Sequence, residues 1–171
     1  MAAGSFDPRG TDRRILLGFG TRAVMMARTV SSSVEEVWTA LTDADRLSQW
    51  LGTPQGRLEL TQMFTLYGAT CEIVVCRPPH RLDLSWTRAG ETNTLRVGVS
   101  SRPGGTEVVL EHAGIRNLAL VGYGPSWEER LAHLEEHLCG LQVPQHDCRE
   151  LELTLRPLWS QHLPPDERPA A

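Results

Sequence analysis

The sequence has no lysine: all 17 of its basic residues are arginines, and 21 acidic residues outnumber them. The formal net charge is -4 at pH 7. Proteins that bind nucleic acids need a surplus of positive charge on the contacting face. We therefore expect no nucleic-acid partner.

Long apolar runs are also missing, and a transmembrane helix needs about 20 consecutive apolar residues. Arg13 and Arg14 precede the run ILLGFG, as in a twin-arginine export signal, but Arg22 soon follows the run and no clean cleavage site appears. We expect a cytoplasmic protein with no membrane partner.

Paired cysteine motifs are absent as well. Cys71, Cys76, Cys139 and Cys148 show no C-x-x-C spacing, and a chain of 171 residues can build a core without disulfides. These thiols are expected to be free and reduced.

The sequence contains no G-x-S-x-G, phosphate-binding loop or dinucleotide-binding fingerprint. HLEEH (133–137) does match the H-x-x-E-H pattern of one class of zinc peptidases. However, a catalytic zinc usually takes a third protein ligand, and Glu136 is predicted to point into solvent, opposite the leucines of its helix. We therefore predict no metal and no cofactor.

What the sequence does contain is an early helical segment and a late one. Ser33 and Glu36 have the spacing of a capping box, which predicts a helix start. The apolar stripe that follows has helical spacing: Val34, Val37, Trp38 and Leu41. A second short helix is predicted at DADRLSQWL (43–51). The late helix is predicted over 127–141, with the stripe Trp127, Leu131, Leu134, Leu138 and Leu141 and with Glu128 pointing away from it.

Short strands are predicted before and between these helices, separated by turn residues such as Pro103 and Gly104. The predicted strands are 22–30, 57–60, 62–68, 69–76, 81–87, 93–101 and 106–113. Alternation places three rows on one inner face: Leu82, Leu84 and Trp86; Leu95, Val97 and Val99; Val108, Leu110 and His112.

The two ends carry weaker patterns. Residues 1–20 are predicted to form an irregular arm, with a short strand near Ile15–Leu17. The C-terminal extension, 142–171, contains LELTL (151–155), whose period-two leucines leave two alternatives open. This segment would either add an edge strand or cover the mouth of a pocket.

In its order of elements and its motifs, the segment 22–141 resembles the START-like (helix-grip, SRPBCC) superfamily. It is most similar there to bacterial homologues of the C-terminal domain of the heat-shock-protein ATPase activator. The segments that carry the resemblance are 28–52, 76–86, 105–114 and 123–138.

The resemblance implies an α+β helix-grip domain over residues 21–141. A curved antiparallel sheet would wrap around a long C-terminal helix, with two short helices after the first strand. It also implies a hydrophobic cavity, used in some relatives to sequester antibiotics for self-resistance and in more distant ones for polyketide cyclisation. The superfamily has no common catalytic motif, so the fold alone does not define an activity.

Five residues are the candidates for ligand contact: Trp50, Tyr67, Trp86, His112 and Trp127. Indoles and phenols combine apolar surface with a polar group, as ligand pockets require. His112, at the end of its row, would anchor a ligand or act as a base. For each residue the alternative is ordinary packing in the core.

Three functions follow from these patterns. We expect a non-enzymatic protein that binds a hydrophobic or aromatic small molecule, such as a natural product. The alternatives are a cyclase or aromatase in which His112 moves protons, and a co-chaperone-like domain that contacts a protein partner.

Overall fold

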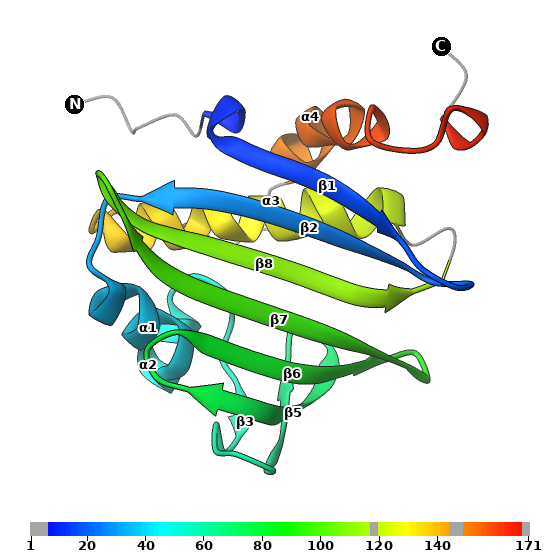
Figure 1. Ribbon diagram of the computed structural model, residues 1–171. Helices are drawn as coiled ribbons and strands as arrows, with labels where there is room; N and C mark the ends of the chain where they lie inside the picture. The colour runs from blue at the N-terminus through cyan, green and yellow to red at the C-terminus, as the bar shows by residue number, and fades with distance from the viewer. Residues whose placement is uncertain (1–6, 117–119, 144–148, 169–171) are drawn as a thin grey trace.

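The protein is built around one eight-stranded antiparallel sheet (Figure 1). The computed structural model describes residues 7–116, 120–143 and 149–168. The strands lie side by side in the order β1-β2-β8-β7-β6-β5-β4-β3. Their bounds are β1 Thr11–Leu17, β2 Arg22–Val30, β3 Gln55–Gly56, β4 Met63–Leu66, β5 Ala69–Arg77, β6 Arg81–Arg88, β7 Glu91–Arg102 and β8 Gly105–Ile115.

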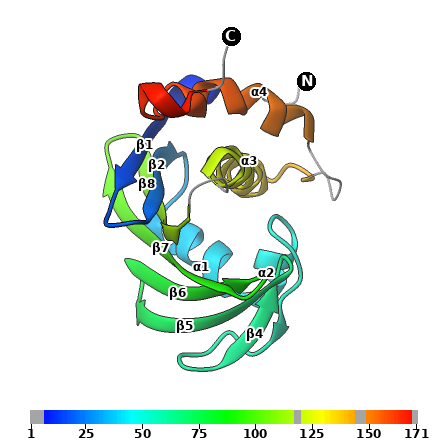
Figure 2. The same cartoon turned by 90° about the vertical axis from the view of Figure 1, so that its right-hand side faces the viewer.

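Four helices accompany the sheet: α1 Val34–Thr42, α2 Ala44–Ser48, α3 Leu120–Leu138 and α4 Arg149–Ser160. Short 3-10 turns, η1 Pro8–Gly10 and η3 Pro165–Glu167, lie near the two ends. Figure 2 shows α3 between the curved sheet and α4, which covers its outer side. The predicted α+β helix-grip fold is confirmed, including two short helices after the strand at 22–30. No helix in the described part of the chain is long and apolar enough to span a membrane.

The predicted inner rows of the sheet are confirmed. Leu84 pairs with Leu95, and Val97 pairs with Leu110 on the next strand, so the rows lie in register across β6, β7 and β8. Their side chains are all buried: Leu82, Leu84, Trp86, Leu95, Val97, Val99, Val108, Leu110 and His112. The start of α1 also follows the prediction, since the Ser33 hydroxyl accepts a hydrogen bond from the Glu36 N–H at 3.2 Å.

The short strand predicted near Ile15–Leu17 is confirmed, but the prediction of an irregular arm is wrong for residues 11–14, which belong to the same strand. This strand, β1, pairs with β2 from Thr11 opposite Arg28 to Leu17 opposite Arg22. Charged and polar residues hid this strand from the sequence pattern. The partner of Arg13 is Glu128 on α3, 115 positions away in the sequence.

The period-two interpretation of the tail is also wrong, because residues 149–160 form a helix rather than a strand. Leu151, Leu155, Leu158 and Trp159 turn toward the core at helical spacing, whereas Leu153 is exposed. A window of five residues matched period two by coincidence. The longer window, 151–159, has the period of a helix.

Other boundaries shift by one to three residues, but two predicted segments differ more clearly. Residues 57–60 form no strand; only Gln55 and Gly56 pair with β4 nearby, and Leu60 makes an isolated bridge to Ile73. Helix α3 starts at Leu120, with Pro125 inside it, and ends at Leu138, so that Leu141 lies beyond it and is exposed. Pro125 and Ser126 have the pattern of a helix start, which led to the late predicted boundary, but they lie inside α3.

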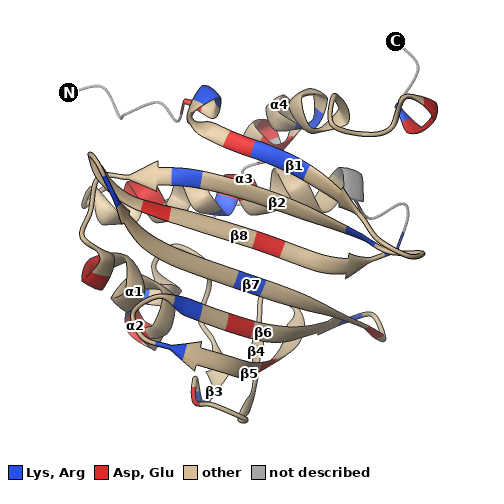
Figure 3. Ribbon diagram, viewed as in Figure 1, with Lys and Arg blue, Asp and Glu red and all other residues tan. Residues whose placement is uncertain are grey.

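Figure 3 shows acidic residues on β8 and basic residues on its two neighbours, β2 and β7. Cross-strand ion pairs join β7 to β8, with Arg96 2.7 Å from Glu111 and Arg102 2.9 Å from Glu107. The acidic residues Glu107 and Glu111 of β8 are thus each matched by an arginine of β7.

Candidate ligand-binding site

An apolar cavity lies between the inner face of the sheet and the helices. Its wall comes from the end of α1, from α2 and the segment after it, from β4 to β8, and from α3. The lining residues are Leu41, Thr42, Leu47, Trp50, Leu51, Leu58, Phe64, Leu66, Ile73, Leu82, Leu84, Trp86, Leu95, Val97, Val108, Leu110, Trp127, Arg130 and Leu131. Apart from Thr42, Arg130 and the indole N–H groups, this wall has no polar side-chain group.

The cavity is narrow. The space between the lining atoms is about 680 Å³, including the part that is open to solvent. The volume that the centre of a water-sized sphere can occupy is only about 50 Å³. A ligand of aromatic size therefore has to spread the leucine-rich wall as it enters. Such a wall can yield by rotamer changes, since no ion pair crosses it.

Three of the five predicted contact residues line this cavity: Trp50, Trp86 and Trp127. The Trp50 indole donates a hydrogen bond to the Ala40 carbonyl at 2.9 Å, which fixes Trp50 against α1. The buried Trp86 Nε1 has no hydrogen-bond partner among the described residues. Trp86 and Trp127 meet edge to face, with ring centroids 5.3 Å apart.

His112 lies behind these indoles and is not among the lining residues. It is fully buried, and its Nδ1 accepts a hydrogen bond from Trp127 Nε1 at 2.8 Å. An indole N–H can only donate, so Nδ1 carries the lone pair and Nε2 carries the proton of the neutral ring. Burial lowers the pKa of His112 to about 4. This imidazole is neutral near pH 7, and its basic nitrogen is already occupied.

Tyr67 is half exposed and likewise lies outside the lining. Its ring lies under the guanidinium of Arg130, with 3.7 Å between the Arg130 carbon and the ring centroid. The sequence reasoning missed Arg130. The available signal was its position three residues after Trp127, which puts a charge within the apolar stripe of α3.

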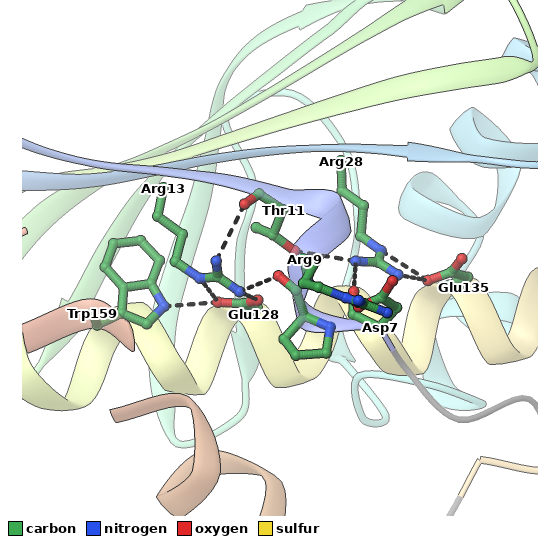
Figure 4. A network of polar contacts seen from close by, with 9 residues as sticks. Asp7, Arg9, Thr11, Arg13, Arg28, Glu128, Glu135 and Trp159 are labelled. Atoms are coloured by element: carbon green, nitrogen blue, oxygen red, sulfur yellow. Dashed lines mark hydrogen bonds and ion pairs between the residues drawn. The ribbon is translucent and has the colours of Figure 1, made fainter. Parts of the chain in front are cut away.

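Helix α3 carries a second group of buried charges on its outer side (Figure 4). Glu128, predicted to point away from the apolar stripe, is fully buried there. It accepts hydrogen bonds from Arg13 Nε at 2.7 Å and from Trp159 Nε1 at 2.8 Å. Further along the same helix, Arg28 donates from Nε to Glu135 at 2.8 Å. These contacts tie β1, β2 and α4 to the back of α3.

The HLEEH segment gives no metal centre in the described part of the chain, where no group of three potential metal ligands occurs. His137 Nε2 instead accepts a hydrogen bond from Arg46 Nε at 3.1 Å. Glu136 is half-buried rather than solvated as predicted, and burial raises its pKa.

This architecture, an antiparallel sheet closed over a long helix with a cavity between them, defines a START-like protein of the SRPBCC type. Residues 31–139 match the sequence pattern of the family described as "Activator of Hsp90 ATPase homolog 1-like protein". The chain belongs to this family.

Solved structures agree with that assignment. The crystal structure of CalU16 from Micromonospora echinospora is 28% identical with a TM-score of 0.78, covering 89% of this chain and 97% of that one. The crystal structure of DynU16, a protein of the dynemicin biosynthetic locus, is 20% identical with a TM-score of 0.64, covering 73% of this chain and 49% of that one. EF2215 from Enterococcus faecalis is 18% identical with a TM-score of 0.69, covering 89% and 92% of the two chains. Comparison with curated protein sequences gave no match.

Proposed function

We propose that this protein binds a hydrophobic, aromatic small molecule in the cavity between the sheet and α3. The observation that carries the proposal is the wall itself: apolar side chains from the sheet and helices converge there around space that they do not fill. Affinity would come mainly from burial of apolar ligand surface, at about 25 cal/mol per Å². The wall of Trp50, Trp86 and Trp127 favours a flat ligand.

A natural product is the ligand class that we propose, with sequestration in self-resistance as the biological role. DynU16 resembles this chain in its fold, and it comes from the dynemicin biosynthetic locus. That origin supports the proposal of a natural product. We further propose a cytoplasmic location, since the described cysteines Cys71, Cys76 and Cys139 are free thiols, as is usual in a reducing compartment.

The cyclase alternative loses its main support at His112. It needed a basic nitrogen facing the substrate, whereas Nδ1 of His112 accepts from Trp127. A protein-interaction role stays a prediction. Leu17 and Phe19, which are exposed at and after the end of β1, are the apolar side chains that a partner would meet first there.

The test uses N-phenyl-1-naphthylamine, a neutral aromatic probe whose fluorescence rises on leaving water. We expect saturable binding, quenching of tryptophan emission and a higher Tm. At a probe concentration of about 100 times Kd, binding adds about 2.7 kcal/mol of stability, which corresponds to a Tm increase of roughly 5–10 °C.

A matched pair of variants locates the binding. Val97→Phe adds a ring inside the cavity wall, while Val74→Phe adds the same ring at an exposed position on β5. We expect Val97→Phe to weaken probe binding at least tenfold and Val74→Phe to leave it within twofold. Equal effects of the two variants, or no saturable binding by the native protein, would refute the proposal.

A further inference from the structure

Arg130 is a buried cation in the wall of the cavity. It is only 6% exposed, although it lies in an otherwise apolar lining. Its NH1 donates to the carbonyl and hydroxyl oxygens of Ser126, one turn earlier in α3. The guanidinium also lies over the ring of Tyr67 and 5.5 Å from the ring of Trp127. These contacts orient the side chain but do not neutralise it.

Arg130 forms no ion pair with any residue that the structure describes, although the carboxylates of Glu129 and Glu152 lie near enough to favour its charged form. By contrast, the buried Arg28 pairs with Glu135, and the largely buried Arg13 pairs with Glu128. Burial lowers the pKa of Arg130, which reflects the cost of holding this charge away from water. A buried charge without a counter-charge is unfavourable, and such groups gather where a ligand supplies the missing partner.

The free polar groups of the cavity wall are mainly donors. The Trp50 and Trp127 indoles already donate to Ala40 and His112. The Thr42 hydroxyl donates to the Trp38 carbonyl at 2.8 Å. This leaves the unpartnered Trp86 Nε1 and the guanidinium of Arg130. No carboxylate lines the cavity in the described part of the chain, and the oxygen of the Thr42 hydroxyl is a single neutral acceptor. A ligand that accepts hydrogen bonds therefore complements this wall better than one that only donates them.

We propose that the ligand is an aromatic compound with one anionic oxygen group, and that Arg130 binds this group inside the cavity. The planar guanidinium suits the role, because Tyr67 covers its face while the N–H groups point outward in its plane. Tyr67 acts as a positioning residue. The inference rests on the proposed function and specifies the charge of the ligand that the cavity binds.

The test compares two probes that differ by a single group. 8-Anilinonaphthalene-1-sulfonate is N-phenyl-1-naphthylamine with one added sulfonate, and the fluorescence of both rises in apolar surroundings. We expect the native protein to bind the sulfonate at least tenfold more tightly than the neutral probe, as a charge-assisted hydrogen bond predicts. In the native protein, side-chain NMR should show the Arg130 Nε–H signal shifting markedly further downfield with the sulfonate than with the neutral probe, because only the sulfonate accepts a hydrogen bond from it.

Arg130→Gln removes the charge and should weaken sulfonate binding at least tenfold while changing neutral-probe binding less than twofold. Arg130→Lys should retain more sulfonate affinity than Arg130→Gln. Arg14→Gln, at an exposed arginine of β1, makes the same change in net charge and should leave both affinities within twofold.

Equal binding of the two probes by the native protein would overturn the inference while leaving the proposed function intact. Equal weakening of both probes in Arg130→Gln would do the same. Should that variant not fold, the NMR shift in the native protein decides. Failure of both probes to bind would instead refute the proposed function and the inference together.

Discussion

The two sides of α3 treat buried charge in opposite ways. On the outer side, Glu128 is fully buried and receives hydrogen bonds from Arg13 and Trp159 (Figure 4). On the cavity side, Arg130 is almost as buried and has no carboxylate partner in the described structure. The outer charge is completed by the protein itself and holds elements together. The inner charge is the one that, in our proposal, a bound ligand completes.

The largest expected effect is on the outer side. Glu128→Gln keeps the shape of the side chain but leaves the Arg13 guanidinium buried without a counter-charge. We expect the free energy of unfolding to fall by about 3–5 kcal/mol, measured by urea denaturation. Asp12→Asn, in the exposed Asp12–Arg14 pair of the same strand, should cost less than about 1 kcal/mol. Similar losses in both variants would remove the distinction between the two pairs.

A pH experiment addresses His112, which supports Trp127 on the cavity side. Its pKa is about 4 in the folded protein, against 6.5 for a freely solvated histidine, because burial disfavours the charged ring. Below pH 6.5 the unfolded chain therefore binds a proton that the folded chain does not, and stability falls as the pH drops toward 4. The loss should reach roughly 3 kcal/mol.

His112→Gln keeps an acceptor for the Trp127 N–H but does not titrate. Its unfolding free energy should depend less on pH than that of the native protein between pH 6.5 and 4, as followed by chemical denaturation at each pH. Parallel curves for the two proteins would contradict the assignment of a neutral, buried imidazole.

The contact between α3 and α4 depends on the lack of a side chain at Gly124. A Cβ there would overlap the indole ring of Trp159, whereas a Cβ at Gly122 would meet nothing within 4 Å. Gly124→Ala should therefore cost about 1–3 kcal/mol by forcing the helices apart. Gly122→Ala should be neutral or stabilising by less than about 1 kcal/mol. Thermal unfolding of the pair measures the difference, and equal Tm values would show that α4 adjusts freely.

The smallest effect is expected for Arg130→Met. Replacing an unpaired buried cation by an apolar side chain of similar length should change the free energy of unfolding by less than about 1 kcal/mol, or raise it. The same urea denaturation experiment applies. A loss as large as that of Glu128→Gln would mean that Arg130 is a structural charge, and the contrast between the two sides of α3 would disappear.

The sheet and the cavity-facing part of α3 were predictable because one-dimensional patterns determine them. The inner rows of β6, β7 and β8 alternate strictly, and Trp127, Leu131 and Leu134 repeat at helical spacing. Trp50, Trp86 and Trp127 were identified as wall residues for the same reason. Their assignment as ligand contacts stays a prediction.

The outer side of α3 could not be predicted, because its burial depends on partners distant in the sequence. Glu128 has the pattern of a solvent-facing residue until β1 supplies Arg13 and α4 supplies Trp159. His112 was placed in the correct row, but its indole partner comes from α3 rather than from a neighbouring strand. Arg130 was missed because a charged residue on a helix usually lies on the solvent-exposed face.

The polar contacts on the outer side of α3 determine which wall of the cavity can move. Arg13, Arg28 and Trp159 tie this helix to β1, β2 and α4, so swinging it outward would break buried polar contacts along its length. The opposite wall contains Leu47, Leu51 and Leu58, whose side chains make apolar contacts. Its polar tie to α3 is the hydrogen bond from Arg46 to His137 at 3.1 Å, and no ion pair of the described residues joins it to α3. A ligand would thus enter through a local movement of α2 and the segment after it, while α3 stays fixed.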